Sequence, residues 1–151
     1  MKAAESKDNK ALASLIIINN DRYEGYKTAA DETKEPDLKK LFAEYSLQSK
    51  GWSQELRRLI PFKDEAPDRD ATTLSGKFYR AWMDVKAALT GHSRKSILAS
   101  CEYGEDVALK TYDAVLDNPE DVSSELLTLL RSQRSELQKA HDNIKQMRDS
   151  A

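Results

Sequence analysis

The feature that most constrains this chain is the helical spacing of its apolar residues along four long segments. In the first segment they recur three or four positions apart, at Leu12, Leu15, Ile16, Tyr23, Tyr26 and Ala30. Residues with this spacing share one face of an α-helix. No stretch alternates apolar and polar residues as a half-buried strand does, and no hairpin turn signal is present. The sequence therefore predicts an all-α fold.

Prolines and glycines mark where the predicted helices begin and end. Pro36 suits a first helical turn, Pro61 stops the second helix, and Gly91 ends a shorter one. The first helix is expected to begin with Asp8 as its N-cap. The predicted helices cover residues 8–32, 36–60, 73–89, 93–116 and 122–148, approximately.

Four long helices and one short one indicate a ferritin-like four-helix bundle. The segment 62–72, rich in Asp and Pro, is expected to be a loop. Together with the short helix it would form the one long crossover that joins two antiparallel hairpins. The length suits one domain, residues 1–151, with a core at about residues 9–149.

Composition excludes several classes of partner and predicts a location. The net charge is -2, and no stripe of basic residues is present, so we expect no nucleic-acid or anionic-membrane binding. The longest apolar run, residues 15–18, is too short to span a bilayer, and the N-terminus lacks the apolar region of a signal peptide. A single cysteine cannot form an intramolecular disulfide, which agrees with a reducing compartment. A cytoplasmic location is expected.

Four polar residues fall on the apolar stripes and predict a polar layer in the middle of the bundle. They are Asn19, Gln48, Glu105 and Gln133, one on each long helix. A satisfied network of buried hydrogen bonds is the simplest interpretation of this layer. We expect the charge of Glu105 to be neutralised by Arg134 or Gln133 on the last helix, because an unpaired buried carboxylate is costly.

A di-metal site is the alternative interpretation of the same layer. Ferritin-like di-metal sites use a Glu from each of two helices and a Glu-x-x-His from each of the other two. The layer offers one carboxylate and three amides, and amides are weak ligands for iron or manganese. We therefore expect no metal and no cofactor. A site could be rebuilt only if several helices were rotated, and it would then draw on Glu24, Glu44, Glu102, Glu105, Glu136 and His141.

The segment Cys101-Glu102-Tyr103-Gly104-Glu105-Asp106 concentrates unusual residues in one helix. Its helical phase turns Glu105 inward and Glu102 and Asp106 toward water. Cys101 is expected to be a small core residue, because no histidine is placed to activate it. Gly104 costs about 1 kcal/mol against Ala in a helix, which close approach of the helix carrying Trp82 would explain.

Several motifs together give the chain a family resemblance. They are Arg80-Ala81-Trp82-Met83, Lys86-Ala87-Ala88, Gly91, Ile97-Leu98, Cys101-Glu102, Gly104-Glu105-Asp106, Tyr112 and His141-Asp142. The chain resembles, from about Leu12 to Asp149, an uncharacterised bacterial family of ferritin-like bundles classed as a domain of unknown function. Ala81 and Tyr103 depart from the commoner Gly and Arg of that family. The resemblance implies a bacterial cytoplasmic protein with no established activity and no ligand set.

The leading functional hypothesis is a non-catalytic bundle that acts by binding or self-association, with a homodimer expected and a role in a stress response as one option. The first alternative is an atypical di-metal oxidase or sensor. The second is a small-molecule binder with a pocket near Trp82 and Gly104.

Overall fold

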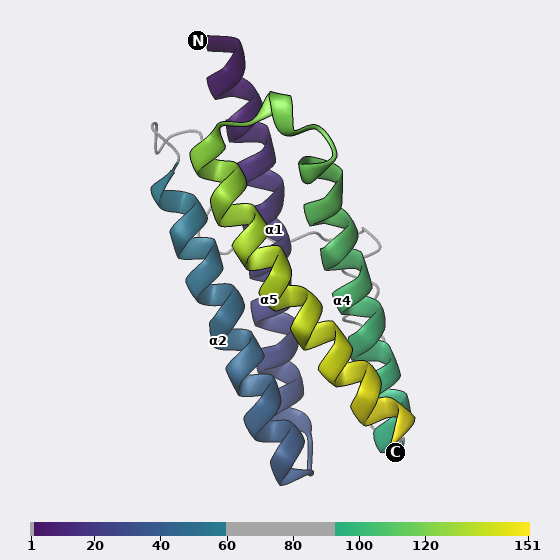
Figure 1. Ribbon diagram of the computed structural model, residues 1–151. Helices are drawn as coiled ribbons and strands as arrows, with labels where there is room; N and C mark the ends of the chain where they lie inside the picture. Colours follow the sequence, from purple (N-terminus) through teal and green to yellow (C-terminus); the bar gives the residue numbers. More distant parts are fainter. Residues whose placement is uncertain (1, 60–92) are drawn as a thin grey trace.

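The computed structural model describes residues 2–59 and 93–151, with side chains from residue 10 onward apart from that of residue 121. This part of the chain forms four α-helices and no strand (Figure 1). The α-helices are α1 (Lys2–Glu32), α2 (Pro36–Arg58), α4 (Arg94–Leu116) and α5 (Ser124–Asp149), with a 3-10 turn, η2 (Pro119–Asp121), before α5. The predicted helix 73–89, with Trp82, lies outside the described residues.

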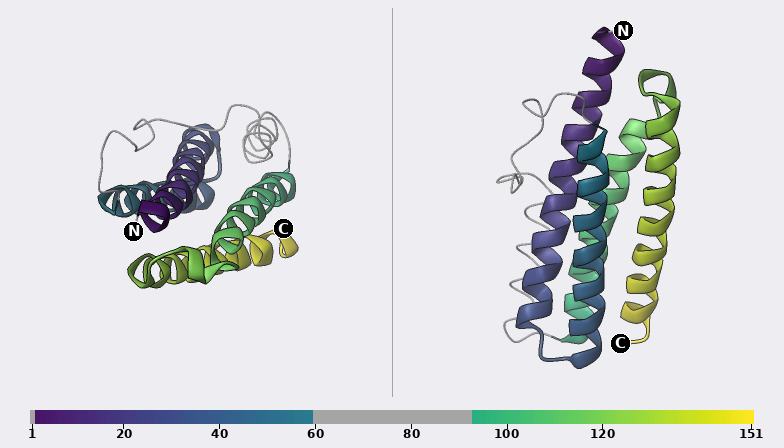
Figure 2. Two further views of the ribbon diagram at one scale, coloured as in Figure 1. Left: turned by 90° about the horizontal axis from the view of Figure 1, so that it is seen from above. Right: turned by 90° about the vertical axis from the view of Figure 1, so that its left-hand side faces the viewer.

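The four helices form two antiparallel pairs. α1 packs along α2, α4 packs along α5, and α1 also contacts α4. α2 and α4 run in the same direction (Figures 1 and 2), and the guanidinium of Arg94 at the start of α4 binds Asp37 at the start of α2, at 2.6 and 3.0 Å. As a result, Leu59 and Ser93 lie at opposite ends of the bundle.

Three of the predicted helix starts are corrected, two of them by capping residues. α1 begins at Lys2 instead of Asp8, because the Ala- and Glu-containing residues before Asp8 favour a helix. Ser93 and Ser123 are N-caps that accept hydrogen bonds from the backbone N–H groups of Ser96 and Leu126. α4 and α5 therefore begin at residues 94 and 124 instead of 93 and 122. α2 ends at Arg58, and residue 60 is outside the described part.

All four helices contribute to a common hydrophobic core. Side chains with no exposed surface come from each of them, including Leu15, Phe42, Leu98 and Leu130. The predicted stripe of α1 is buried except at Tyr23, which is only half-buried. None of the described helices is long and apolar enough to cross a membrane.

Gly51 offers a direct way to stabilise the bundle. It lies inside α2, and a Cβ added there would meet no atom within 4 Å. Glycine in a helix interior costs roughly 0.5–1 kcal/mol relative to alanine, because more backbone freedom is lost on folding. Gly51→Ala is therefore expected to raise the free energy of unfolding by about that amount, measured by urea denaturation. A destabilised variant would show that another part of the chain contacts this face of α2.

Candidate functional site

The most unusual feature of the core is a fully buried ion pair between α1 and α4. Arg22 and Glu105 have relative exposures of 0%. The pair is bidentate: Nε of Arg22 donates to Oε1 of Glu105 at 2.6 Å, and Nη2 donates to Oε2 at 2.9 Å. Two parallel charge-assisted hydrogen bonds are the strongest way in which a guanidinium binds a carboxylate. Both oxygens of Glu105 are thus committed to Arg22.

The third nitrogen of the guanidinium binds α2. Nη1 of Arg22 donates to Oε1 of Gln48 at 3.0 Å and to Oγ of Ser49 at 2.9 Å. Burial alone lowers the pKa of Arg22, but the charge of Glu105 and its hydrogen bonds outweigh burial, so the net pKa lies above its usual value. The arginine is therefore a permanent cation that joins three helices.

Three aromatic rings surround this cation. The central carbon of the guanidinium lies 5.2 Å from the ring centre of Tyr26, and 5.4 Å from the ring centres of Tyr45 and Trp52. Aromatic faces attract cations, more strongly when water is excluded. These aromatic rings therefore help to stabilise a buried charge.

A chain of hydrogen bonds continues from this ion pair to α5. The hydroxyl of Ser49 donates to Oδ1 of Asn19 at 2.9 Å, and Nδ2 of Asn19 donates to the hydroxyl of Tyr112 at 2.8 Å. The Tyr112 hydroxyl in turn donates to Oε1 of Gln133 at 2.7 Å. The network, defined as Glu105, Arg22, Gln48, Ser49, Asn19, Tyr112 and Gln133, thus links all four described helices. Within the described residues, Nε2 of Gln133 is buried without a hydrogen-bond partner.

The four residues of the expected polar layer all lie in this network. Asn19, Glu105 and Gln133 are buried, whereas Gln48 is partly exposed. Asn19 and Gln48 do not bond to each other directly; Ser49 and Arg22 lie between them in the chain of hydrogen bonds.

The predicted neutralising partner of Glu105 was wrong. Arg134 binds the carboxylate of Asp113 at 2.6 Å, and the partner of Glu105 is Arg22 on the first helix. The sequence did contain a signal for it. Arg22 lies seven residues after Leu15 and four before Tyr26, in phase with the buried stripe of α1. A charged residue in phase with an apolar stripe indicates a buried partner.

The residues of the alternative metal site are not brought together. Glu24 and Glu44 are exposed on α1 and α2, and Glu136 is exposed and paired with Lys139 at 3.0 Å. Glu105 is occupied by Arg22, and only Glu102 and His141 approach each other, at 3.9 Å. Among the described residues, no group of three or more His, Cys, Asp or Glu side chains is placed to hold a metal ion.

A separate charged cluster joins α4 to the end of α5. Nε2 of His141 lies 2.7 Å from Asp106, and Nδ1 lies 3.0 Å from Asp142. The hydrogen bond to His141 lowers the pKa of Asp142. Glu102 was expected to point to water, but it is only 9% exposed, and the guanidinium of Arg148 in the last turn of α5 binds its carboxylate. Asp106 is partly exposed.

Cys101 is expected to be chemically inert in the folded protein. It is completely buried, and burial raises the pKa of its thiol, with the charge of Glu105 acting in the same direction. A raised pKa keeps the thiol protonated at neutral pH, and only the thiolate is a good nucleophile. A chromogenic disulfide reagent should therefore react slowly with the native protein and rapidly in urea. Fast reaction in native buffer would contradict the buried position.

Together, the fold and site define an all-α helical bundle with a buried, ion-paired polar network. The sequence profile of the family described as domain of unknown function (DUF2383) matches residues 8–118, and the chain belongs to this family. This confirms the expected membership of an uncharacterised family. The match includes the network from α1 to α4 and ends before Gln133 on α5. A comparison with curated proteins found no match.

Proposed function

We propose that this protein is a ferritin-like bundle that holds no metal and acts by binding, without catalysis. The observation that carries the proposal is the bidentate pair of Arg22 and Glu105, at 2.6 and 2.9 Å. In ferritin-like di-metal proteins, inward carboxylates and histidines hold cations at the bundle core. Here the guanidinium itself supplies the cation beside the inward carboxylate.

Helix direction supports the ferritin-like part of the proposal. α2 and α4 run parallel (Figure 1), so the end of α2 and the start of α4 lie at opposite ends of the bundle. One long crossover between two antiparallel hairpins is the connectivity of ferritin-like folds. The same proposal includes a bacterial origin and a cytoplasmic location.

Charge and ligand supply explain why a metal is disfavoured at this position. A divalent metal would compete with Arg22 for the oxygens of Glu105 and would lie near a cation whose pKa is raised. At a separation of about 4 Å, like charges repel by roughly 4 kcal/mol per unit-charge product at an effective dielectric constant of 20. The remaining polar groups are amides and hydroxyls, which are poor ligands for iron and manganese.

Aerobic oxidation of ferrous iron tests this proposal as an activity. We expect the rate of ferric-iron formation, followed by absorbance, to be the same with and without the protein. Glu105→Gln should leave that rate unchanged, because the wild-type carboxylate takes no part. Faster oxidation by the wild type, lost in Glu105→Gln, would instead establish the di-metal oxidase.

Self-association is the second part of the proposal, in the form of a homodimer. Leu47 on α2 and Tyr103 on α4 are large hydrophobic side chains that are 64% and 47% exposed. A second copy of the chain that covered either side chain would remove its apolar surface from water, which favours association. Sedimentation equilibrium should give twice the mass of the chain. A monomer at all accessible concentrations would contradict this part and leave the metal-free core untouched.

A further inference from the structure

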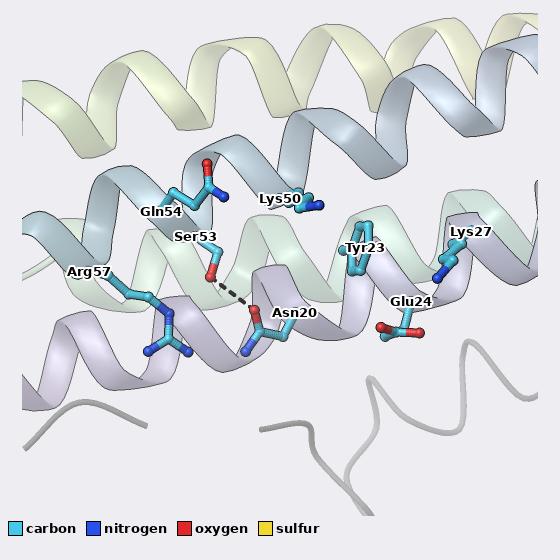
Figure 3. Close-up of a pocket in the computed structure, with 8 residues that line it drawn as sticks. All are labelled: Asn20, Tyr23, Glu24, Lys27, Lys50, Ser53, Gln54 and Arg57. Atoms are coloured by element: carbon cyan, nitrogen blue, oxygen red, sulfur yellow. Dashed lines mark hydrogen bonds between the residues drawn. The ribbon is translucent and has the colours of Figure 1, made fainter. Parts of the chain in front are cut away.

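A pocket of about 460 Å³ opens between α1 and α2 (Figure 3). Each helix lines it with four residues spaced i, i+3, i+4 and i+7. They are Asn20, Tyr23, Glu24 and Lys27 on α1, and Lys50, Ser53, Gln54 and Arg57 on α2. Residues with this spacing form one face of a helix. Two polar faces therefore meet along a seam where paired helices usually pack apolar side chains.

The inner part of the pocket is polar and buried. Asn20 and Ser53 are only 8% and 4% exposed, and the hydroxyl of Ser53 donates to Oδ1 of Asn20 at 2.9 Å. One turn further along α1, the backbone carbonyl of Tyr23 accepts a hydrogen bond from the hydroxyl of Ser46 at 2.8 Å. These contacts fix the two helix faces at a set distance. The pocket is therefore held by hydrogen bonds on its inner side, and its volume falls within the roughly 300–1,000 Å³ of small-molecule sites.

The rim of the pocket is cationic. Nζ of Lys27 and Nζ of Lys50 come from different helices and lie 5.7 and 5.6 Å from the ring centre of Tyr23. Among the described residues, neither lysine forms an ion pair. Among the described residues that line the pocket, Arg57 is a third basic residue and Glu24 is the one acid. Two ammonium groups that line one pocket and form no ion pair among the described residues leave an excess of positive charge, which a bound anion would offset.

From this arrangement we propose that the pocket binds a small molecule carrying an oxyanion, either a phosphate or a carboxylate group. Lys27 and Lys50 both line the pocket, and their ammonium groups bind the charged oxygens. Gln54 lines the same pocket and supplies an uncharged donor and acceptor, and Glu24 accepts a hydrogen bond from a hydroxyl of the ligand body. The inference gives a ligand class to the binding role proposed above and rests on that role. The pocket is separate from the Arg22–Glu105 pair, so a failed test of oxyanion binding would leave the proposal of a metal-free core unaffected.

Isothermal titration calorimetry of the full-length protein at constant ionic strength tests the pocket. The probes are inorganic phosphate, glucose 6-phosphate, succinate and, as a neutral comparison, glucose. We expect at least one anion to bind with a Kd below about 1 mM, and glucose not to bind. Binding of inorganic phosphate as tight as that of glucose 6-phosphate would assign the free ion, and tighter binding of the sugar phosphate would assign an organic ligand. Either result supports the oxyanion site.

Matched variants locate the binding. Lys50→Gln and Lys27→Gln remove exposed side chains and should each weaken anion binding about tenfold, as expected for loss of one charge-assisted hydrogen bond. Lys40→Gln removes another exposed charge, from α2 outside the pocket, and should leave the Kd unchanged. The proposal would be overturned if Lys40→Gln weakened anion binding as much as the pocket variants do, or if neither pocket variant changed the Kd. It would also be overturned if glucose bound as tightly as the anions, or if no anion bound.

Discussion

Arg22→Met is expected to lower the free energy of unfolding by about 3–5 kcal/mol. The variant leaves Glu105, which has no exposed surface, without its cation. Removal of one partner from a buried ion pair strands an uncompensated charge, which explains the size of the loss. Urea denaturation followed by circular dichroism measures it.

Replacement of both partners distinguishes the contribution of the ion pair to stability from the contribution of side-chain packing. The double variant Arg22→Met/Glu105→Leu removes both charges and keeps much of the side-chain volume. It should be more stable than Arg22→Met alone, because replacing a whole buried pair by apolar residues is often neutral or stabilising. A double variant whose loss equals the sum of the two single losses would show that the two residues do not interact.

Tyr112→Phe should lower the free energy of unfolding by about 1–3 kcal/mol. The Tyr112 hydroxyl accepts from Asn19 at 2.8 Å and donates to Gln133 at 2.7 Å. Its removal leaves the whole amide of Gln133 buried without a partner, since Nε2 has none among the described residues. A buried polar group left unsatisfied costs its full desolvation penalty. Thermal and urea unfolding both measure the loss.

Tyr103→Phe is the matched control for this effect. It removes the same hydroxyl from an exposed tyrosine on the same helix, and its stability should change by no more than about 0.5 kcal/mol. Tyr112→Phe combined with Gln133→Leu should recover part of the lost stability, because the unpaired oxygen and nitrogen of the Gln133 amide are then gone. A Tyr112→Phe variant as stable as the wild type would mean that the network adds nothing to folding.

Helical periodicity predicted the helices well because it reflects burial directly. The all-α class and the long segments follow from residues such as Leu15, Phe42 and Leu130, whose spacing and burial agree. The ends of the helices were predicted less well. Asp8 looked like an N-cap because of its residue type, but residues before it also favour a helix, so α1 continues to Lys2.

The candidate site could be predicted only in part, for a reason of chemistry. Asn19, Glu105 and Gln133 stand out because each is polar within an apolar stripe. Arg22 has the same helical phase, but arginine is mostly exposed in proteins, and its side chain is long enough to place its charge well away from its own backbone. Helical phase gives the face of a helix and leaves the reach of a long side chain undetermined.

The ion-pair partners between helices could not be predicted from the sequence either. Arg134 lies near the polar layer along α5, yet it binds Asp113 at 2.6 Å because that carboxylate is half-exposed and within reach. The pairing of Arg22 with Glu105 depends on the relative depth and rotation of α1 and α4. Pairings separated by 83 positions in the sequence are set by how the helices pack.

The metal content of the full-length protein, purified from cells grown with added iron, manganese and zinc, tests the central claim most directly. Inductively coupled plasma mass spectrometry should find far less than one metal ion per chain, in the wild type and in Glu105→Gln alike, because Arg22 already neutralises the inward carboxylate. One or two metal ions per chain in the wild type, lost in Glu105→Gln, would contradict the claim that an arginine takes the place of a metal in this bundle.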